Sequence, residues 1–190
     1  MIWLRLFFIS QLIINSLVIQ AQPRRAPNPV SGSEIVAAVN ALRAQYGLRE
    51  KQMTRTYDEA RKEPGLTGEA FVELLEMRLD ALVLRSGFAR TILQARQTVL
   101  HRHILVDGKI VDRPSFRVSP GQTIQVKAKA VTMEPYMAAA AGAHRDLLPE
   151  VPDYLEVELE RLTAKLVRRP KRAEVPVICE VQLVVEFYAR

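Results

Sequence analysis

Apolar residues recur at helical spacing along the part of the chain that follows residue 33. A first helix is predicted from Ser33, which can cap it, to Gly47, which can end it. A second helix is predicted over residues 49–62 and a third from Thr67, with a Pro-Gly break between them. The buried stripe of the first helix consists of Ile35, Val39, Leu42 and Tyr46.

Two short helices are predicted next along the chain. Leu79, Leu82 and Val83 share one face of the first of them, and Gly87 ends it. Thr91 is expected to cap the second helix. The inward face of that helix consists of Ile92, Ala95 and Val99, with Arg96 beside them.

A tight hairpin is predicted after the second of these helices. Asp107-Gly108 separates the β-prone runs 104–106 and 109–111, and Asp-Gly in that position is a strong hairpin signal. Pro120-Gly121 marks another turn, and residues 123–126 alternate like a half-buried strand. Two helices and a hairpin together make a small α+β module.

Residues 155–160 alternate between apolar and acidic side chains, which predicts a strand with one apolar and one acidic face. We expect the acidic face to point to solvent or to a basic neighbour. The alanine-rich residues 137–143 fit either a short helix or a disordered insertion, and the pattern does not choose between them.

Positive charge is concentrated in residues 78–129. This segment contains ten Lys and Arg against three Asp and no Glu, a formal balance of +7, whereas the whole chain carries only +6. The charge therefore lies on a folded module and not on a flexible tail. A folded domain with a basic surface is typical of a nucleic-acid-binding protein, because neutralising phosphates releases condensed counterions.

This basic module resembles the S4 RNA-binding domain, through the order RLDALVLRSGFA, QARQTVLH and HILVDGKIVDRPSFRVSPG. Its flanks resemble those of the bacterial or organellar small-subunit ribosomal protein S4 family. They read LREKQMTRTYDEARKEPGLTGEAFVELLEMRLD before the module, and YLEV and RRPKRAEVPVICEVQLVVEFYAR after it. The resemblance covers about residues 41–190 and is weak over about 131–150.

The resemblance implies an α+β fold, in which a small helical bundle holds an inserted S4-type module of two helices packed on a small, mainly antiparallel sheet. It divides the chain into an apolar leader with a Pro-rich linker, a helical domain and the RNA-binding domain. The expected boundaries are 1–33 for the leader, 34–77 completed by 177–190 for the helical domain, and 78–176 for the S4-type domain.

The resemblance also implies a structural component of the small ribosomal subunit that binds small-subunit ribosomal RNA directly, nucleates subunit assembly and supports translation. Expected partners are this RNA, neighbouring small-subunit ribosomal proteins and messenger RNA in the channel through which it enters. The alternative is an extra-ribosomal paralogue that acts as a regulatory RNA-binding protein. A ribosomal component would be present at about one copy per subunit, whereas a regulator would not.

Basic side chains on a rigid two-helix face suit an RNA junction, where the phosphates of several strands converge. Arg96 and His103 occupy positions of the family motif, and the other candidates are chosen for charge and placement. The expected RNA-binding residues are Arg78, Arg85, Arg90, Arg96, Gln97, His101, Arg102, His103, Lys109, Arg113 and Arg117.

Arg102 departs from the family pattern, because relatives commonly have Gly between the two histidines of this segment. If Arg102 must adopt a left-handed conformation, it costs roughly 1 kcal/mol relative to Gly. We therefore hypothesise that Arg102 makes a contact with a phosphate that compensates for this cost.

The N-terminal segment departs further. Relatives carry a basic arm, in some cases with a zinc-binding cysteine cluster, but this chain has no CxxC and therefore no zinc site of that kind. Residues 1–21 are largely apolar with one early basic residue, Arg5, which is typical of a secretory signal. The absence of acidic residues before Glu34 is compatible with an organellar transit peptide, and a misassigned start is a further alternative. The expected location is the cytoplasmic ribosome, or an organellar ribosome if residues 1–33 are a transit peptide.

Catalysis is not expected. Enzymes that carry an S4-type module also have a separate catalytic domain. Domains typically span 50–250 residues, and too few residues remain outside the module and its flanks to form one. No GxxxxGK[ST], HExxH or GxSxG motif occurs. Cys179 is the single cysteine, which excludes an internal disulfide and is more typical of a buried structural thiol than of a nucleophile. We expect no catalytic residue, metal, cofactor or small-molecule substrate.

Overall fold

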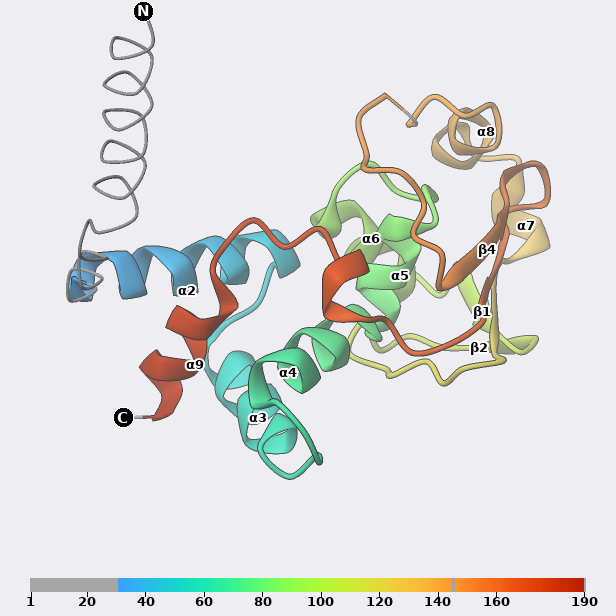
Figure 1. Ribbon diagram of the computed structural model, residues 1–190. Coiled ribbons are helices and arrows are strands. Elements are labelled where there is room, and N and C mark those ends of the chain that lie inside the picture. Colours follow the sequence, from blue (N-terminus) through green and yellow to red (C-terminus); the bar gives the residue numbers. More distant parts are fainter. Residues whose placement is uncertain (1–30, 145, 190) are drawn as a thin grey trace, which may run out of the picture. The chain divides into compact units, whose positions relative to one another are not determined.

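A computed structural model describes residues 31–144 and 146–189 of the chain. The chain divides into two units, residues 1–31 and 32–190, and every described helix and strand belongs to the second. The leader interpretations concern residues 1–30, which lie outside the described residues, so they stay predictions. The described part contains eight α-helices and a five-stranded sheet, which confirms the predicted α+β class (Figure 1).

The first five described helices follow the predicted periodicity closely. The helices are α2 (Gly32–Tyr46), α3 (Glu50–Ala60), α4 (Thr67–Glu76), α5 (Leu79–Arg85), α6 (Ile92–Leu100), α7 (Ala128–Val131), α8 (Glu134–Ala140) and α9 (Val181–Ala189). The strands are β1 (Ile104–Val106), β2 (Lys109–Ile110), β3 (Thr123–Val126), β4 (Leu155–Glu158) and β5 (Thr163–Leu166). Two 3-10 turns are η1 (Leu159–Arg161) and η2 (Arg172–Glu174).

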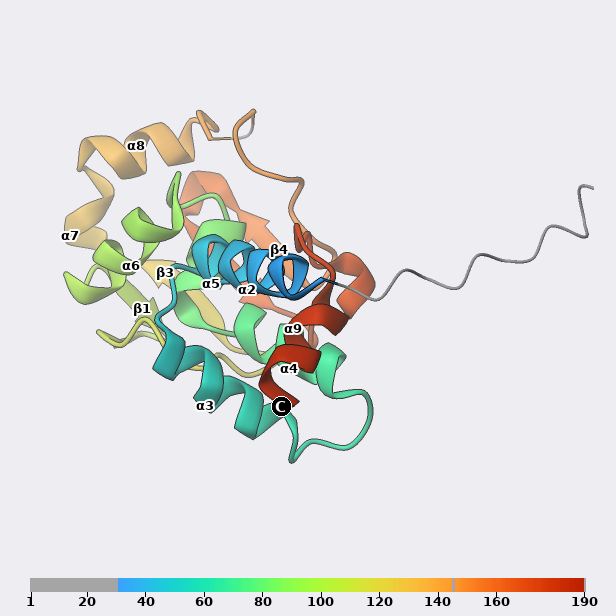
Figure 2. The same ribbon diagram turned by 90° about the vertical axis from the view of Figure 1, so that its left-hand side faces the viewer.

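Helices α2, α3, α4 and α9 enclose one hydrophobic core. The C-terminal helix α9 packs against α2, α3 and α4 although it lies far from them in the sequence (Figures 1 and 2). The predicted stripe is buried, and its members Ile35, Val39, Leu42 and Tyr46 are at most 3% exposed. The prediction for Ser33 is wrong: the helix already begins at Gly32, so Ser33 lies in its first turn.

A second core lies between helices α5 and α6 and the sheet. Of the predicted inward residues, Leu79, Leu82, Val83, Ala95 and Val99 are fully buried there. Ile92 is only half-buried. Val181 of α9 belongs to this second core, whereas Val184 of the same helix belongs to the first. The division into two domains therefore stays a prediction, since one helix contributes to both cores.

The sheet has the order β2-β1-β3-β5-β4 and is antiparallel throughout. The predicted hairpin is confirmed: β1 pairs with β2 across Asp107 and Gly108, whose φ angles are 50° and 75°. The Asp107 carboxylate accepts hydrogen bonds from the Thr123 amide at 2.9 Å and from the Gln122 side chain at 2.7 Å. These bonds lower the pKa of Asp107 and tie the turn to β3.

The first helix of the module ends, and the second begins, at the capping residues that were predicted. Gly87 follows α5 with a φ of 77°, in the left-handed region that glycine adopts easily. The Thr91 hydroxyl accepts a hydrogen bond from the Gln94 amide at 3.2 Å at the start of α6. Both signals were local, which is why the sequence pattern identified them.

Two predictions need adjustment. The strand predicted over residues 155–160 ends at Glu158, because the chain turns through η1 and then through Leu162, with a φ of 48°, into β5. The alternatives left open for residues 137–143 resolve as a helix that begins earlier, α8, with Tyr136 and Ala139 buried.

Candidate nucleic-acid interface

Six of the eleven predicted RNA-binding residues have exposed side chains in the structure. They lie on α6, just before and after it, and on the hairpin that follows. These exposed residues, which we call the hairpin set, are Arg90, Gln97, His101, Arg102, Lys109 and Arg113.

The end of α6 is joined directly to the segment after β2. His101 forms the C-terminal cap of α6, and Arg102 then adopts a left-handed conformation with a φ of 61°, as the comparison with Gly predicted. The Arg102 guanidinium donates to a carboxylate oxygen of Asp112 from Nε at 3.2 Å and from Nη2 at 3.0 Å. Both side chains remain exposed to solvent, so the pair holds α6 and the hairpin in one surface without burying the charge.

His103 is turned toward the protein. Its Nδ1 lies 2.9 Å from the Tyr136 hydroxyl of α8, and the two rings meet edge to face. Partial burial lowers the pKa of His103, and the nearby His101 and Lys127 lower it further. This histidine therefore links the start of β1 to α8, and its contact with RNA stays a prediction.

Arg78 and Arg96 share one buried carboxylate, that of Asp80. Arg78 binds it with Nε at 2.9 Å and Nη2 at 2.7 Å, and its side chain is only 5% exposed. Arg96 binds the same carboxylate with Nη2 at 3.0 Å and donates from Nη1 to the Gly47 carbonyl at 2.5 Å. The pairs connect α5, α6 and the turn after α2.

Arg85 is held by a second buried carboxylate. Its Nε lies 2.5 Å from Glu76, which also accepts from the Tyr46 hydroxyl at 2.6 Å and the Tyr154 hydroxyl at 2.7 Å. Burial raises the pKa of both tyrosines, and the adjacent carboxylate raises it further. Burial alone would lower the pKa of Arg85, but the charge and hydrogen bonds of Glu76 raise it. Arg85 thus stays charged where it is buried.

Arg117 is the remaining candidate and is half-buried. It forms an ion pair with Glu59 of α3, and its backbone forms a bridge with that of Arg78. Arg78, Arg85, Arg96 and Arg117 therefore all have carboxylate partners within the protein. RNA contact by these four residues stays a prediction, but their roles in joining elements of the fold are visible.

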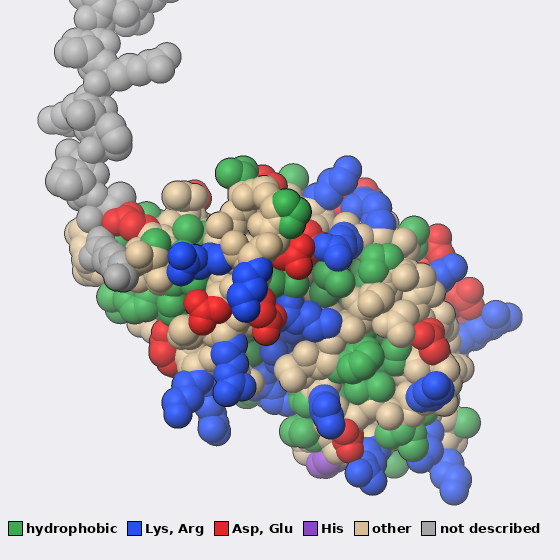
Figure 3. All heavy atoms as spheres, turned by 90° about the horizontal axis from the view of Figure 1, so that it is seen from below, with side chains coloured by type: hydrophobic (Ala, Val, Ile, Leu, Met, Phe, Trp, Pro, Cys, Tyr) green, Lys and Arg blue, Asp and Glu red, His purple; other side chains and the backbone are tan. Residues whose placement is uncertain are grey.

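Sequence reasoning did not single out Glu76 and Asp80. A signal was available, because both are acidic residues on helices with otherwise apolar neighbours, and buried carboxylates are normally paired. The predicted site also omitted three exposed cations of α3 and its N-cap. These are Arg49, Lys51 and Arg55, which line a hollow of about 490 Å³. Figure 3 shows Lys and Arg side chains in several groups over one face of the molecule, with acidic side chains among them.

Other kinds of site find little support. Within residues 31–144 and 146–189 no group of three or more His, Cys, Asp or Glu side chains is placed to hold a metal ion. Cys179 is partly buried, and this burial raises the pKa of its thiol. None of the helices in the described part is both long enough and apolar enough to cross a membrane.

Comparison with known proteins decides the family. Residues 36–76 match the ribosomal protein S4/S9 N-terminal domain, and residues 77–124 match the S4 domain. The chain is 73% identical over 149 residues to the small ribosomal subunit protein uS4 of Beutenbergia cavernae. The aligned residues make up 78% of this chain and 72% of the relative. The chain belongs to the uS4 family. The uS4 proteins of an Arthrobacter species and of Tropheryma whipplei are 71% and 66% identical over similar shares.

The two uS4 family segments meet between Glu76 and Met77. This is the point at which the buried Glu76 carboxylate joins Tyr46 of α2 to Arg85 of α5. In this uS4 protein the junction is thus held by a charged hydrogen-bond network as well as by apolar packing.

Proposed function

We propose that this chain is a structural component of the small ribosomal subunit that binds small-subunit ribosomal RNA directly through the hairpin set. The observation that carries the proposal is the placement of charge. Residues 78–129 hold a formal balance of +7, and Arg90, Arg102, Lys109 and Arg113 project from this segment as exposed side chains.

The hairpin set suits phosphate contacts made from a rigid support. Arg102 is fixed by Asp112, and the hairpin beneath Lys109 is fixed by Asp107. Gln97 and His101 add hydrogen-bonding groups beside these cations. Such groups recognise 2′-hydroxyls and splayed bases, which are the accessible features of folded RNA.

The buried arginines support this surface from behind. Arg96 holds α6 against α5 through Asp80, and Arg85 holds α5 against the helical part through Glu76. We propose that residues 34–77 with 177–190 form a helical domain, and residues 78–176 the S4-type domain. In this arrangement the ion pairs fix the orientation of the RNA-binding domain.

Through this contact the protein nucleates subunit assembly and supports translation. Its further partners are neighbouring small-subunit ribosomal proteins and messenger RNA in the channel through which it enters. The proposed location is the cytoplasmic ribosome, and the proposed role requires no catalysis, metal or cofactor.

Quantitative mass spectrometry of salt-washed small ribosomal subunits tests this proposal. We expect about one copy of the chain per subunit, matching an integral small-subunit protein measured in the same sample. A chain that is absent from washed subunits, but present elsewhere in the cell, would overturn the proposal in favour of an extra-ribosomal RNA-binding protein.

A further inference from the structure

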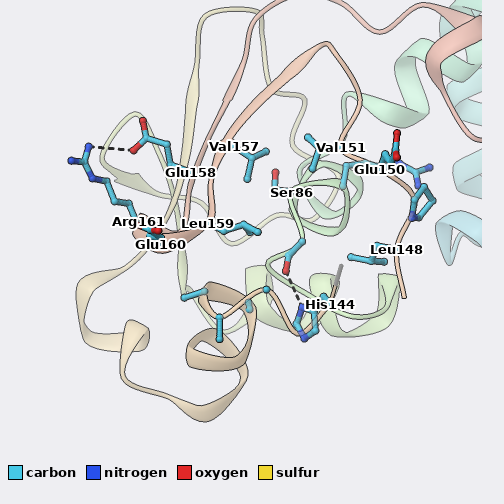
Figure 4. A pocket seen from close by; sticks show the side chains of 17 residues that line it. Ser86, His144, Leu148, Glu150, Val151, Val157, Glu158, Leu159, Glu160 and Arg161 are labelled. Carbon is cyan, nitrogen blue, oxygen red and sulfur yellow. Dashed lines mark hydrogen bonds and ion pairs between the residues drawn. The ribbon is translucent and has the colours of Figure 1, made fainter. Parts of the chain in front are cut away.

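The side of the sheet farthest from the hairpin set carries a hollow of about 920 Å³ (Figure 4). The hollow runs along β4 and η1 and is closed by the end of α8, by residues 148–151 and by the turn after α5. In the sheet order β2-β1-β3-β5-β4, strand β4 is an edge strand. An edge strand presents backbone N–H and C=O groups that a further strand can pair with.

The walls of the hollow combine apolar side chains with polar groups. Leu148, Val151, Val157 and Leu159 line it, and Figure 4 labels all four side chains around the hollow. Val151 is 45% exposed, and the neighbouring Leu147 is 62% exposed. These side chains offer apolar contacts to alternate residues of an extended segment lying along β4.

The rim of the hollow is acidic. Its charged residues are Glu150, Glu158 and Glu160 against Arg85 and Arg161. Arg85 is already bound to the buried Glu76, and Arg161 pairs with Glu158. Glu150 and Glu160 form no ion pair with another described residue, so a cationic occupant would complement them. Glu156 is also exposed on β4, where it lies opposite Lys165 of β5.

We propose that the outer edge of β4 accepts an extended, basic segment of a neighbouring protein as an additional strand. This inference rests on the proposed function, because a subunit supplies fixed neighbours. Main-chain pairing along β4 provides affinity, and the aliphatic side chains and acidic rim of the hollow select a segment in which apolar and Lys or Arg side chains alternate. RNA is disfavoured here because the carboxylates repel phosphates.

Photo-crosslinking in assembled small subunits tests the proposal. The full chain carries p-benzoylphenylalanine at Val151, and crosslinked peptides are identified by mass spectrometry. We expect a crosslink to a protein segment in which apolar and basic residues alternate. A Glu160→Lys substitution should lower its yield at least fivefold, whereas Glu69→Lys, an exposed glutamate on α4, should leave it unchanged.

A second probe at Lys109 separates this inference from the proposed function. If the Lys109 probe crosslinks to ribosomal RNA while the Val151 probe crosslinks only to RNA or to nothing, the docking proposal is overturned and the RNA-binding role stands. A crosslink from Val151 to a non-basic segment, or one whose yield Glu160→Lys leaves unchanged, also overturns it. If neither probe crosslinks within the subunit, the proposed function itself fails.

Discussion

Arg85 and Arg113 lie in the same basic segment of the sequence, yet their surroundings differ completely. The Arg85 side chain is 8% exposed and is bound to a carboxylate that is itself fully buried, whereas Arg113 is exposed beside the hairpin. The same contrast separates Arg78 and Arg96 from Arg102 and Lys109. One group of cations holds the fold together, and the other forms the surface on which RNA binding is proposed.

The contrast shows what charge counting can establish. A local excess of Lys and Arg identifies the domain that carries a basic surface, but each arginine can instead satisfy a buried acid. Long-range partners decide between the two roles. Single substitutions can therefore separate a residue that stabilises the fold from one proposed to contact RNA.

The largest effect is expected from Glu76→Ala. The substitution leaves the buried Arg85 guanidinium and the hydroxyls of Tyr46 and Tyr154 without their shared acceptor. Breaking a buried pair in this way typically costs about 3–5 kcal/mol of unfolding free energy. Urea denaturation measures the loss. Glu73→Ala is the matched control, because Glu73 lies on the same helix and pairs with the exposed Arg169, and such surface pairs contribute at most about 1 kcal/mol.

Equal losses for the two α4 variants would contradict the distinction between buried and surface pairs. RNA affinity measured on folded Glu76→Ala protein sharpens the test. If Glu76 acts only by positioning the RNA-binding domain, the substitution should leave the number of phosphate contacts close to that of the unmodified chain. The salt dependence of the RNA affinity should then also stay close to that of the unmodified chain.

A smaller effect is expected from Arg102→Gly. Glycine removes the cost of the left-handed backbone, about 1 kcal/mol, and loses only a surface pair with Asp112. The free energy of unfolding should therefore rise by up to about 1 kcal/mol while RNA affinity falls. Arg102→Ala removes the same charge but keeps a Cβ, so it should weaken RNA binding without the gain in stability. Unchanged RNA affinity in both variants would end the phosphate-contact hypothesis.

The smallest effect concerns His103 and pH. Its pKa is lowered in the folded protein, so the unfolded chain binds a proton at higher pH than the folded chain does. Stability is then lost as the pH falls through the unfolded value near 6.5. His103→Gln should reduce this loss between pH 7.5 and 5.5, measured as the shift in urea midpoint. His101→Gln removes only one of the smaller causes of the lowered His103 pKa, so it should retain most of the loss, and equal profiles for the two variants would contradict the account.

Local signals predicted much of the fold. The Asp107-Gly108 hairpin, the Thr91 cap and the buried stripe of α2 each depend on residues a few positions apart, so the sequence pattern contained them. The N-cap predicted at Ser33 lies two positions after the residue that precedes the helix, which is within the variation expected at helix ends. The 3-10 turn after β4 was missed because alternation alone does not reveal where a strand stops pairing.

The candidate site was less predictable, for a physical reason. Glu76 and Tyr154 are 78 positions apart, and Arg96 reaches the Gly47 carbonyl across 49 positions. No periodicity records such contacts, so buried and exposed arginines look alike in the sequence. The family resemblance predicted the domain, and the structure then separated the buried, acid-paired cations from the exposed ones.

The most direct test measures the affinity of the full chain for small-subunit ribosomal RNA as a function of salt. If six to ten phosphates are contacted, affinity should fall about 10³–10⁵-fold between 50 and 200 mM salt. Lys109→Ala with Arg113→Ala should weaken binding and reduce the slope of log K against log salt by about 2. Arg161→Ala with Lys165→Ala, in η1 and β5 away from the hairpin, should leave the slope unchanged. A shallow slope for the unmodified chain, or equal changes in both double variants, would contradict the assignment of RNA binding to the hairpin set.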